Sequence, residues 1–185
     1  GHPRMASASG MTAVEMIWAD RRPSRLLSAA SFENALVVQM ALGGSTNAII
    51  HLVALARRAG IPLDLAAVDR VSRHMPVTVN LQPSGTYLME DFHYAGGSAA
   101  FLASIAGHLD LDAATVNGRT LGQNVAGAEV TDDDVIRPLD RPVYAAGATA
   151  VLFGNIAPQG CVMKPSAAEP RLLRHAGPAL VFRDY

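Results

Sequence analysis

A pair of glycines within an apolar stretch, Gly43-Gly44, constrains the fold of this chain more than any other feature. Glycine lets the backbone turn sharply or lets another group approach closely. Ser45, Thr46 and Asn47 follow, and serine and threonine are favoured at helix N-caps, where they accept from free N–H groups. The sequence therefore predicts a tight turn into a capped helix. Because a helix N-terminus can also hold an anion such as a carboxylate, a binding role for the turn stays open.

The segments on both sides of this turn have the apolar spacing of helices. Before it we expect a helix capped by Ser31, and after it apolar residues recur at helical spacing over 48–58. The turn should then be buried between two apolar helices. Two further helices are predicted, one over 12–18 and one that begins after a cap at Asp64.

The character of the sequence changes between residues 115 and 130. The earlier part is mostly helical in pattern, whereas short apolar runs with β-branched residues are typical of strands. Such runs lie at 148–156, 161–164 and 179–182. We therefore expect an α/β chain of the α+β kind in two parts. Residues 1–120 form the helical part of one domain, and residues 121–185 form the start of a β-rich one.

Composition excludes several classes of function. The formal net charge is −1, which gives no electrostatic footprint for nucleic acid or an anionic membrane. No apolar run reaches the ~18 residues needed to span a bilayer. Cys161 is the only cysteine, so no internal disulfide can form, and we expect a cytoplasmic protein. Its position beside apolar strand residues predicts a buried, inert thiol.

A second polar cluster follows the turn at residues 83–85, which contains Ser84. Glu90, Asp91 and His93 lie a few residues further on, among large apolar residues, and could converge on a ligand. The alternative is that Asp91 caps a helix and Glu90 lies on the surface. The histidines of the chain fit no metal-binding spacing, so the residues themselves predict no metal site.

Several ordered motifs resemble the family of dihydroxy-acid dehydratases and phosphogluconate dehydratases. They lie at 43–48 (Gly-Gly-Ser-Thr-Asn-Ala, followed by His51-Leu52), 81–91, 95–97, 115–124, 134–137 and 154–164. The resemblance implies a hydro-lyase that removes water from a 2,3-dihydroxy acid to give a 2-keto acid. It also implies a [2Fe-2S] cluster, a magnesium ion and a homo-oligomer, either a dimer or a tetramer. The family fold pairs an N-terminal α/β domain with a C-terminal β-barrel-like domain.

Within this family, residues 90–97 and 108–110 are most similar to the sugar-acid branch, such as arabinonate and xylonate dehydratases. The implied substrate is then a small sugar acid and the product a 2-keto-3-deoxy acid. A branched-chain dihydroxy-acid dehydratase is the alternative within the family. A catalytically inert fragment with only a structural or interaction role is the alternative outside it.

The resemblance also indicates what this chain lacks. The family's cluster cysteines and a metal-binding aspartate and modified lysine lie upstream of the Gly-Gly turn, and the proposed serine base and a further metal-binding glutamate lie downstream of Tyr185. We therefore expect the middle of such an enzyme, with no catalytic residue and no cluster or magnesium ligand of its own. The candidates to line the active site are Ser45, Thr46, Asn47, Ser84, Glu90 and His93.

Overall fold

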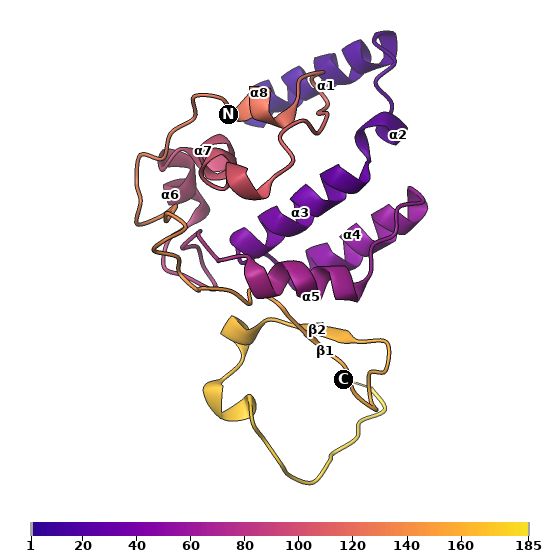
Figure 1. The fold of residues 1–185 in the computed structure, drawn as a ribbon, viewed down its shortest axis with the longest axis vertical. Helices are drawn as coiled ribbons and strands as arrows, with labels where there is room; N and C mark the ends of the chain where they lie inside the picture. Colours follow the sequence, from indigo (N-terminus) through magenta and orange to yellow (C-terminus); the bar gives the residue numbers. More distant parts are fainter. Residues whose placement is uncertain (1, 185) are drawn as a thin grey trace.

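Helices make up one end of the molecule and a two-stranded hairpin the other (Figure 1). The structure is a computed structural model that describes residues 2–184. Its helices are α1 (His2–Trp18), α2 (Pro23–Leu26), α3 (Ala29–Ala41), α4 (Thr46–Arg58), α5 (Leu65–His74), α6 (Met89–Tyr94), α7 (Gly97–Ser104) and α8 (Leu121–Val125). The strands are β1 (Ala150–Leu152) and β2 (Cys161–Met163), and short 3₁₀ turns lie at η1 (Ala106–His108), η2 (Pro165–Ala167) and η3 (Pro170–Leu172).

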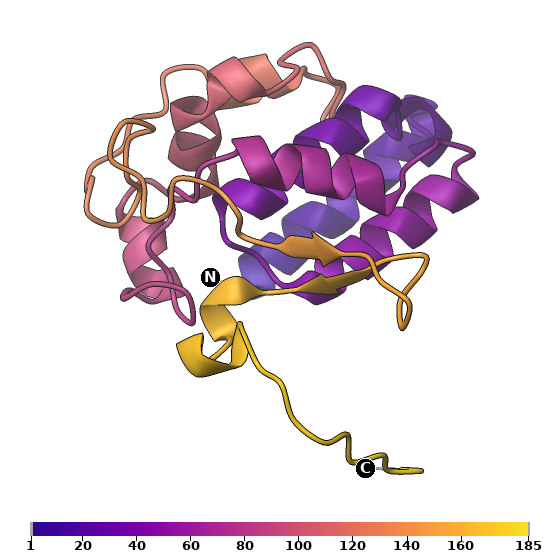
Figure 2. The ribbon, with the colours of Figure 1, turned by 60° about the horizontal axis from the view of Figure 1, so that its bottom comes forward.

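The hairpin packs beneath α5, and the chain after it extends away from the helices (Figure 2). Strands β1 and β2 are antiparallel, with Val151 opposite Val162. The hydroxyl of Ser72 on α5 donates to the carbonyl oxygen of Thr149, directly before β1. Two of the three predicted strands are thus confirmed, although they are shorter than predicted.

The third predicted strand, 179–182, was wrong: these residues form no strand and are exposed. Strand formation needs a hydrogen-bonding neighbour, and the sheet within residues 2–184 pairs only β1 with β2. The prediction of a buried Cys161 was also wrong, because this thiol is exposed. The mixed helix-and-strand class is confirmed, whereas the barrel-like arrangement and the boundary at residues 120 and 121 remain predictions.

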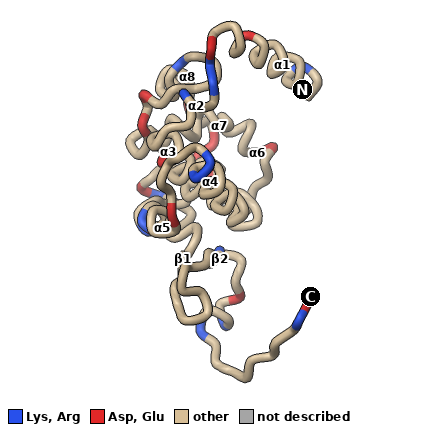
Figure 3. The backbone as a smooth tube through the Cα atoms, turned by 90° about the vertical axis from the view of Figure 1, so that its right-hand side faces the viewer, with Lys and Arg blue, Asp and Glu red and all other residues tan. Residues whose placement is uncertain are grey.

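Helix α1 lies at the opposite end of the molecule from the hairpin (Figure 3). It is longer than the predicted helix over 12–18, and none of its residues is buried. Its large apolar side chains point to solvent, and Trp18 is 84% exposed. No helix within residues 2–184 is both long enough and apolar enough to cross a membrane.

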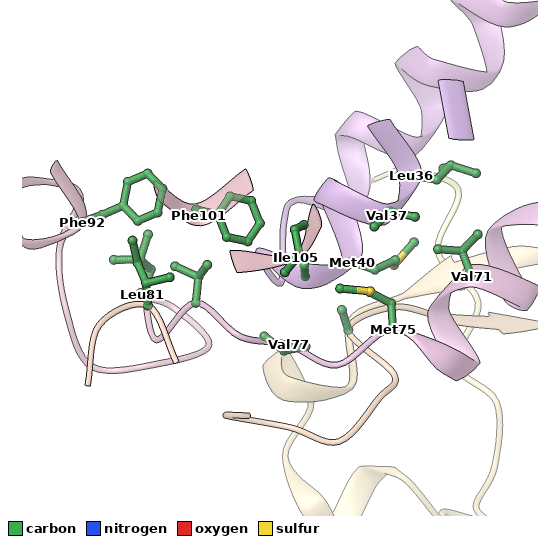
Figure 4. Packing of buried hydrophobic residues seen from close by; sticks show 14 of the residues in the cluster. Leu36, Val37, Met40, Val71, Met75, Val77, Leu81, Phe92, Phe101 and Ile105 are labelled. Atoms are coloured by element: carbon green, nitrogen blue, oxygen red, sulfur yellow. The ribbon is translucent and has the colours of Figure 1, made fainter. Parts of the chain in front are cut away.

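The core is built around α3, which lies in the middle of the helical part in Figure 1, and Figure 4 shows its buried side chains Leu36, Val37 and Met40. Leu36 and Met40 of α3 are almost fully buried, and α5 covers them with Val68 and Val71. The ring of Phe101 meets that of Phe92 edge to face, with centroids 6.1 Å apart. This packing fixes the end of α3, and therefore the position of the Gly-Gly turn that follows it.

A buried extended segment, residues 75–81, passes under the end of α3. Its backbone does not join a regular sheet, but isolated bridges pair Val77 with Tyr144 and Val79 with Ile136. The N–H group of Thr78 donates to the carbonyl oxygen of Ala41, the last residue of α3. The segment supplies backbone hydrogen bonds that the end of α3 needs.

The helix starts follow local capping chemistry. Asp64 caps α5 and accepts from the N–H of Ala67, as predicted. The cap of α3 differs from the prediction: Ser28, and not Ser31, is the N-cap. Ser31 occupies the third helical position and reaches back to the N–H of Ser28. The two serines form a capping box, in which each side chain accepts from the backbone of the other.

Candidate functional site

The Gly43-Gly44 turn ends α3 with a Schellman motif. The N–H of Gly43 donates to Met40 O and the N–H of Gly44 donates to Gln39 O, at 3.0 and 2.9 Å. Gly43 has a φ of +60°, which a residue with a side chain adopts only with strain. Ser45 then caps α4, because its hydroxyl accepts from the N–H of Asn47 at 3.2 Å. The predicted turn into a capped helix is therefore confirmed.

Side chains donate hydrogen bonds to the carbonyl oxygens of Gly43, Gly44 and Ser45. The Nζ atom of Lys164 donates to the carbonyl oxygens of Gly43 and Gly44, at 2.5 and 3.2 Å. The Nε2 atom of Gln39 donates to the carbonyl oxygen of Ser45 at 2.6 Å. Because each carbonyl is bonded, the turn is fixed both by its own helix and by a residue from beyond β2.

A cavity of about 640 Å³ opens beside the turn. Its apolar walls come from α3, the loop at 81–83, α6 and α7, and include the core residues Leu81, Phe92 and Phe101 labelled in Figure 4. Its polar lining residues are Ser45, Thr46, Gln82, Ser98 and Lys164. A concave, mostly apolar space with a few converging polar groups is the usual form of a small-molecule site.

Lys164 is the one charged residue among those that line this cavity. It is half-buried, and burial lowers the pKa of its ammonium group. None of the ion pairs within residues 2–184 includes it. Lys164 is not among the site residues predicted from the sequence. One feature of the sequence could have indicated it: Lys164 is the only lysine of the chain, and all the other residues counted as Lys or Arg are arginines.

Ser84 lines a second, smaller cavity of about 240 Å³, which has Gly43 in its wall. Its hydroxyl is 3.1 Å from that of Ser166, and the hydroxyl of Tyr144 donates to its carbonyl oxygen at 3.0 Å. Gly43 lines both cavities. The structure thus places Ser84 close to the turn but on a different cavity from Thr46.

The remaining candidates do not line either cavity. Asn47 is exposed on the first turn of α4, and its backbone N–H, rather than its side chain, serves the cap. Glu90 and His93 lie exposed on α6. Asp91 accepts from the N–H of Leu88 at 2.8 Å, which is the capping role considered for it. The structure therefore places Ser45 and Thr46 on the larger cavity, and a role in binding remains a prediction for all six candidates.

The described residues do not fit an iron–sulfur cluster or a magnesium site. Within residues 2–184, no group of three or more His, Cys, Asp and Glu side chains is placed to hold a metal ion. A [2Fe-2S] cluster needs about four ligands, mostly thiolates, and Cys161 is the only thiol of the chain.

Two family models match the chain. Residues 2–124 match the model described as dihydroxy-acid/6-phosphogluconate dehydratase N-terminal, and residues 134–185 match its C-terminal counterpart. The chain belongs to the dihydroxy-acid/6-phosphogluconate dehydratase family.

The chain is similar to curated proteins that are named as sugar-acid and dihydroxy-acid dehydratases. It is 52% identical to a 6-deoxy-6-sulfo-D-gluconate dehydratase of Pseudomonas putida, over 100% of this chain and 32% of that protein. It is 49% identical to an L-arabonate dehydratase of Azospirillum brasilense, over 97% of this chain and 31% of that protein. A dihydroxy-acid dehydratase of Caldanaerobacter subterraneus is 46% identical, over 97% of this chain and 33% of that protein. The chain thus spans about a third of the length of these relatives.

Proposed function

We propose that the whole protein is a hydro-lyase that dehydrates a sugar acid. Loss of the proton at C2 and of the hydroxyl at C3, together one water, leaves an enol that becomes a 2-keto-3-deoxy acid. The main support for this proposal is sequence identity. About half of the residues are identical, over nearly the whole chain, to those of proteins named as sugar-acid dehydratases. The similarity of residues 90–97 to that branch supports the same substrate class.

The contribution of this chain is to bind and orient the substrate. Ser45 and Thr46 offer hydroxyl groups to the hydroxyls of a sugar acid, and apolar residues form most of the cavity wall. Asn47, Ser84, Glu90 and His93 stay candidates for contacts made when the rest of the protein is in place. We assign no residue of this chain as the acid or base of the reaction.

The iron–sulfur cluster and magnesium ion implied by the family would act as Lewis acids toward the leaving hydroxyl and the carboxylate. We propose that residues outside this chain hold both groups, since the described residues do not. We also propose a homo-oligomer, a dimer or tetramer. The exposed apolar face of α1, which includes Met11, Ile17 and Trp18, supports association with further protein surface.

The test is a substrate screen of the whole protein. L-Arabinonate, D-xylonate and D-gluconate would be compared with 2,3-dihydroxyisovalerate, and formation of the 2-keto acid measured after reaction with semicarbazide. We expect turnover of at least one sugar acid in preference to the branched acid. Turnover of 2,3-dihydroxyisovalerate alone would establish the branched-chain alternative, and no turnover by protein loaded with cluster and magnesium would favour the inert alternative.

A further inference from the structure

The side chain of Lys164 ties together two parts of the chain that separate family models match. Lys164 lies in the part that matches the C-terminal model, and the Gly-Gly turn lies in the part that matches the N-terminal model. One ammonium group donates to two successive carbonyl oxygens, those of Gly43 and Gly44, which are 121 and 120 positions away along the chain. This contact therefore holds the turn relative to the hairpin.

The hairpin fixes the backbone from which Lys164 extends. Met163, the last residue of β2, pairs with Ala150 of β1. Directly before β1, the carbonyl oxygen of Thr149 accepts a hydrogen bond from the hydroxyl of Ser72 on α5. Because these contacts hold the end of β2 beside α5, Lys164 reaches the turn from a fixed position.

The carbonyl groups that Lys164 holds lead directly into the start of α4. Gly43 and Gly44 have no side chains, and a glycine backbone has a wide range of conformations. A peptide unit is planar, so the carbonyl oxygen of Gly44 and the backbone nitrogen of Ser45 lie in one rigid plane. An ammonium group that holds this oxygen therefore fixes the direction in which the chain enters Ser45 and Thr46.

Ser45 and Thr46 carry hydroxyl groups that remain available for a ligand, and both residues line the larger cavity. The hydroxyl of Ser45 accepts from the N–H of Asn47, which leaves its own O–H free to donate. Within residues 2–184, the hydroxyl of Thr46 has no hydrogen-bond partner. Where these two hydroxyl groups lie depends on the conformation of the turn.

The stability of the turn alone does not account for a charged group at this place. The N–H groups of Gly43 and Gly44 already close α3, and Ser45 already caps α4. Burial disfavours the charge of the Lys164 ammonium group and lowers its pKa, and no ion pair within residues 2–184 offsets that cost. Ionisable groups perturbed in this way beside a cavity are frequent at functional sites.

We propose that Lys164 is a positioning residue for the dehydration, which holds the Gly43-Gly44 turn so that the hydroxyl groups of Ser45 and Thr46 contact those of the substrate. Its ammonium group acts on the turn and does not touch the substrate, whose carboxylate is left to the magnesium ion proposed outside this chain. The inference rests on the proposed function and adds to it the residue that orders the binding hydroxyl groups.

The first experiment uses the whole protein and the sugar acid that it dehydrates fastest. Lys164→Met removes the ammonium group and keeps a side chain of similar length. We expect kcat to fall at least about tenfold while KM changes less than about threefold, because the carboxylate is still held and oriented hydroxyl contacts matter most in the transition state. Arg174→Met is the matched control, since it removes one positive charge from an exposed residue outside the cavity and should change neither constant.

A double-mutant cycle separates positioning from a general loss of stability. Thr46→Val removes the hydroxyl group and keeps the shape of the side chain. If Lys164 acts through the turn, the factor by which Lys164→Met lowers kcat/KM should be at least about threefold smaller in the Thr46→Val background. Independent effects multiply, so an equal factor in both backgrounds would overturn the inference.

A crystal structure of the unmodified whole protein covers the case in which Lys164→Met fails to fold. Crystals would be soaked with the acid and frozen before turnover. We expect Nζ of Lys164 to stay within hydrogen-bonding distance of the carbonyl oxygens of Gly43 and Gly44, and the hydroxyl of Thr46 to contact a hydroxyl of the ligand. An ammonium group bonded to the ligand itself, or a ligand that touches neither Ser45 nor Thr46, would contradict the inference.

These outcomes are distinct from failure of the proposed function. If the Lys164→Met and Arg174→Met variants have equal kcat, the inference fails while the proposed function stands. If the whole protein dehydrates 2,3-dihydroxyisovalerate alone, the proposed substrate class fails, and the same variants measured with that acid still decide the role of Lys164.

Discussion

The side-chain amide of Gln39 occupies the space beside Gly44 into which a Cβ atom would project. A Cβ atom built there would lie 2.6 Å from Cδ and 2.8 Å from Nε2 of Gln39, which is closer than such atoms approach. The same amide holds the carbonyl oxygen of Ser45 and cannot move without losing that bond. The second glycine of the turn is therefore required by packing.

Gly44→Ala should destabilise the chain by about 1–3 kcal/mol, the usual cost of overpacking a tight site. Urea unfolding of the 185-residue chain measures this free energy. The cost should be smaller in a Gln39→Ala background, because the clash is then absent and the two sites are coupled. An equal cost in both backgrounds would contradict this explanation.

Gly10→Ala is the matched control for the glycine substitution. Gly10 lies within α1, and nothing is within 4 Å of a Cβ atom built there. Because alanine is favoured over glycine in a helix by ~1 kcal/mol, this variant should be equally or more stable than the parent chain.

Asn34 joins α3 to a loop 76 residues away. Its Nδ2 donates to the carbonyl oxygen of Asp110 at 2.9 Å, and its Oδ1 accepts from the N–H of Asp110 at 2.8 Å. Asn34→Ala leaves both backbone groups without these partners and should cost about 1–3 kcal/mol. Glu33→Ala, at the exposed neighbouring position, should change stability by less than about 0.5 kcal/mol. Amide hydrogen exchange at Asp110 should accelerate only in the Asn34 variant; unchanged protection there would show that the pairing contributes nothing.

The cap of α5 gives a prediction that separates a hydrogen bond from a charge. Asp64→Ala removes the acceptor for the N–H of Ala67 and should lower the free energy of unfolding by about 0.5–2 kcal/mol. Asp64→Asn keeps an oxygen acceptor and should lose less than half of that. If the two variants are equally destabilised, the charge rather than the hydrogen bond is the important feature.

The exposed thiol of Cys161 should react in the folded chain. With Ellman's reagent and no denaturant, we expect one thiol per chain to be modified at a rate close to that in the unfolded chain, since access does not require opening of the structure. Cys161→Ser should give no reaction. A thiol that reacts only after urea is added would show that the end of the hairpin is covered in solution.

The sequence by itself determined the local features of this protein. Asp64 was correctly predicted as a cap, and a capped helix was correctly predicted after the Gly43-Gly44 turn, although which residue caps it was not specified. A cap bonds to N–H groups two or three residues further on, so its partners are fixed by chain connectivity. Ser28 was missed for a related reason. Ser28 and Ser31 bond reciprocally, and their sequence alone does not specify which serine begins the helix.

Two of the six residues selected from the sequence line the larger cavity, and whether any of the six binds substrate remains a prediction. Ser45 and Thr46 line the cavity because they form the wall at the start of α4. Asn47 is next in sequence, yet it lies outside this wall, since successive residues of a helix point in directions about 100° apart. Glu90 and His93 were grouped by their nearness in sequence, but α6 presents both to solvent.

Only the tertiary structure decided which distant residues meet. Lys164 reaches the carbonyl oxygen of Gly43 across 121 positions of the chain, and this contact depends on how the hairpin packs against α5. Residues 179–182 have the composition of a strand but no neighbour to pair with in the described chain. Helix caps and turns close over a few residues, so local sequence specifies them. Strand pairing and the lining of a cavity join segments whose separation is set only when the whole core of the chain has packed.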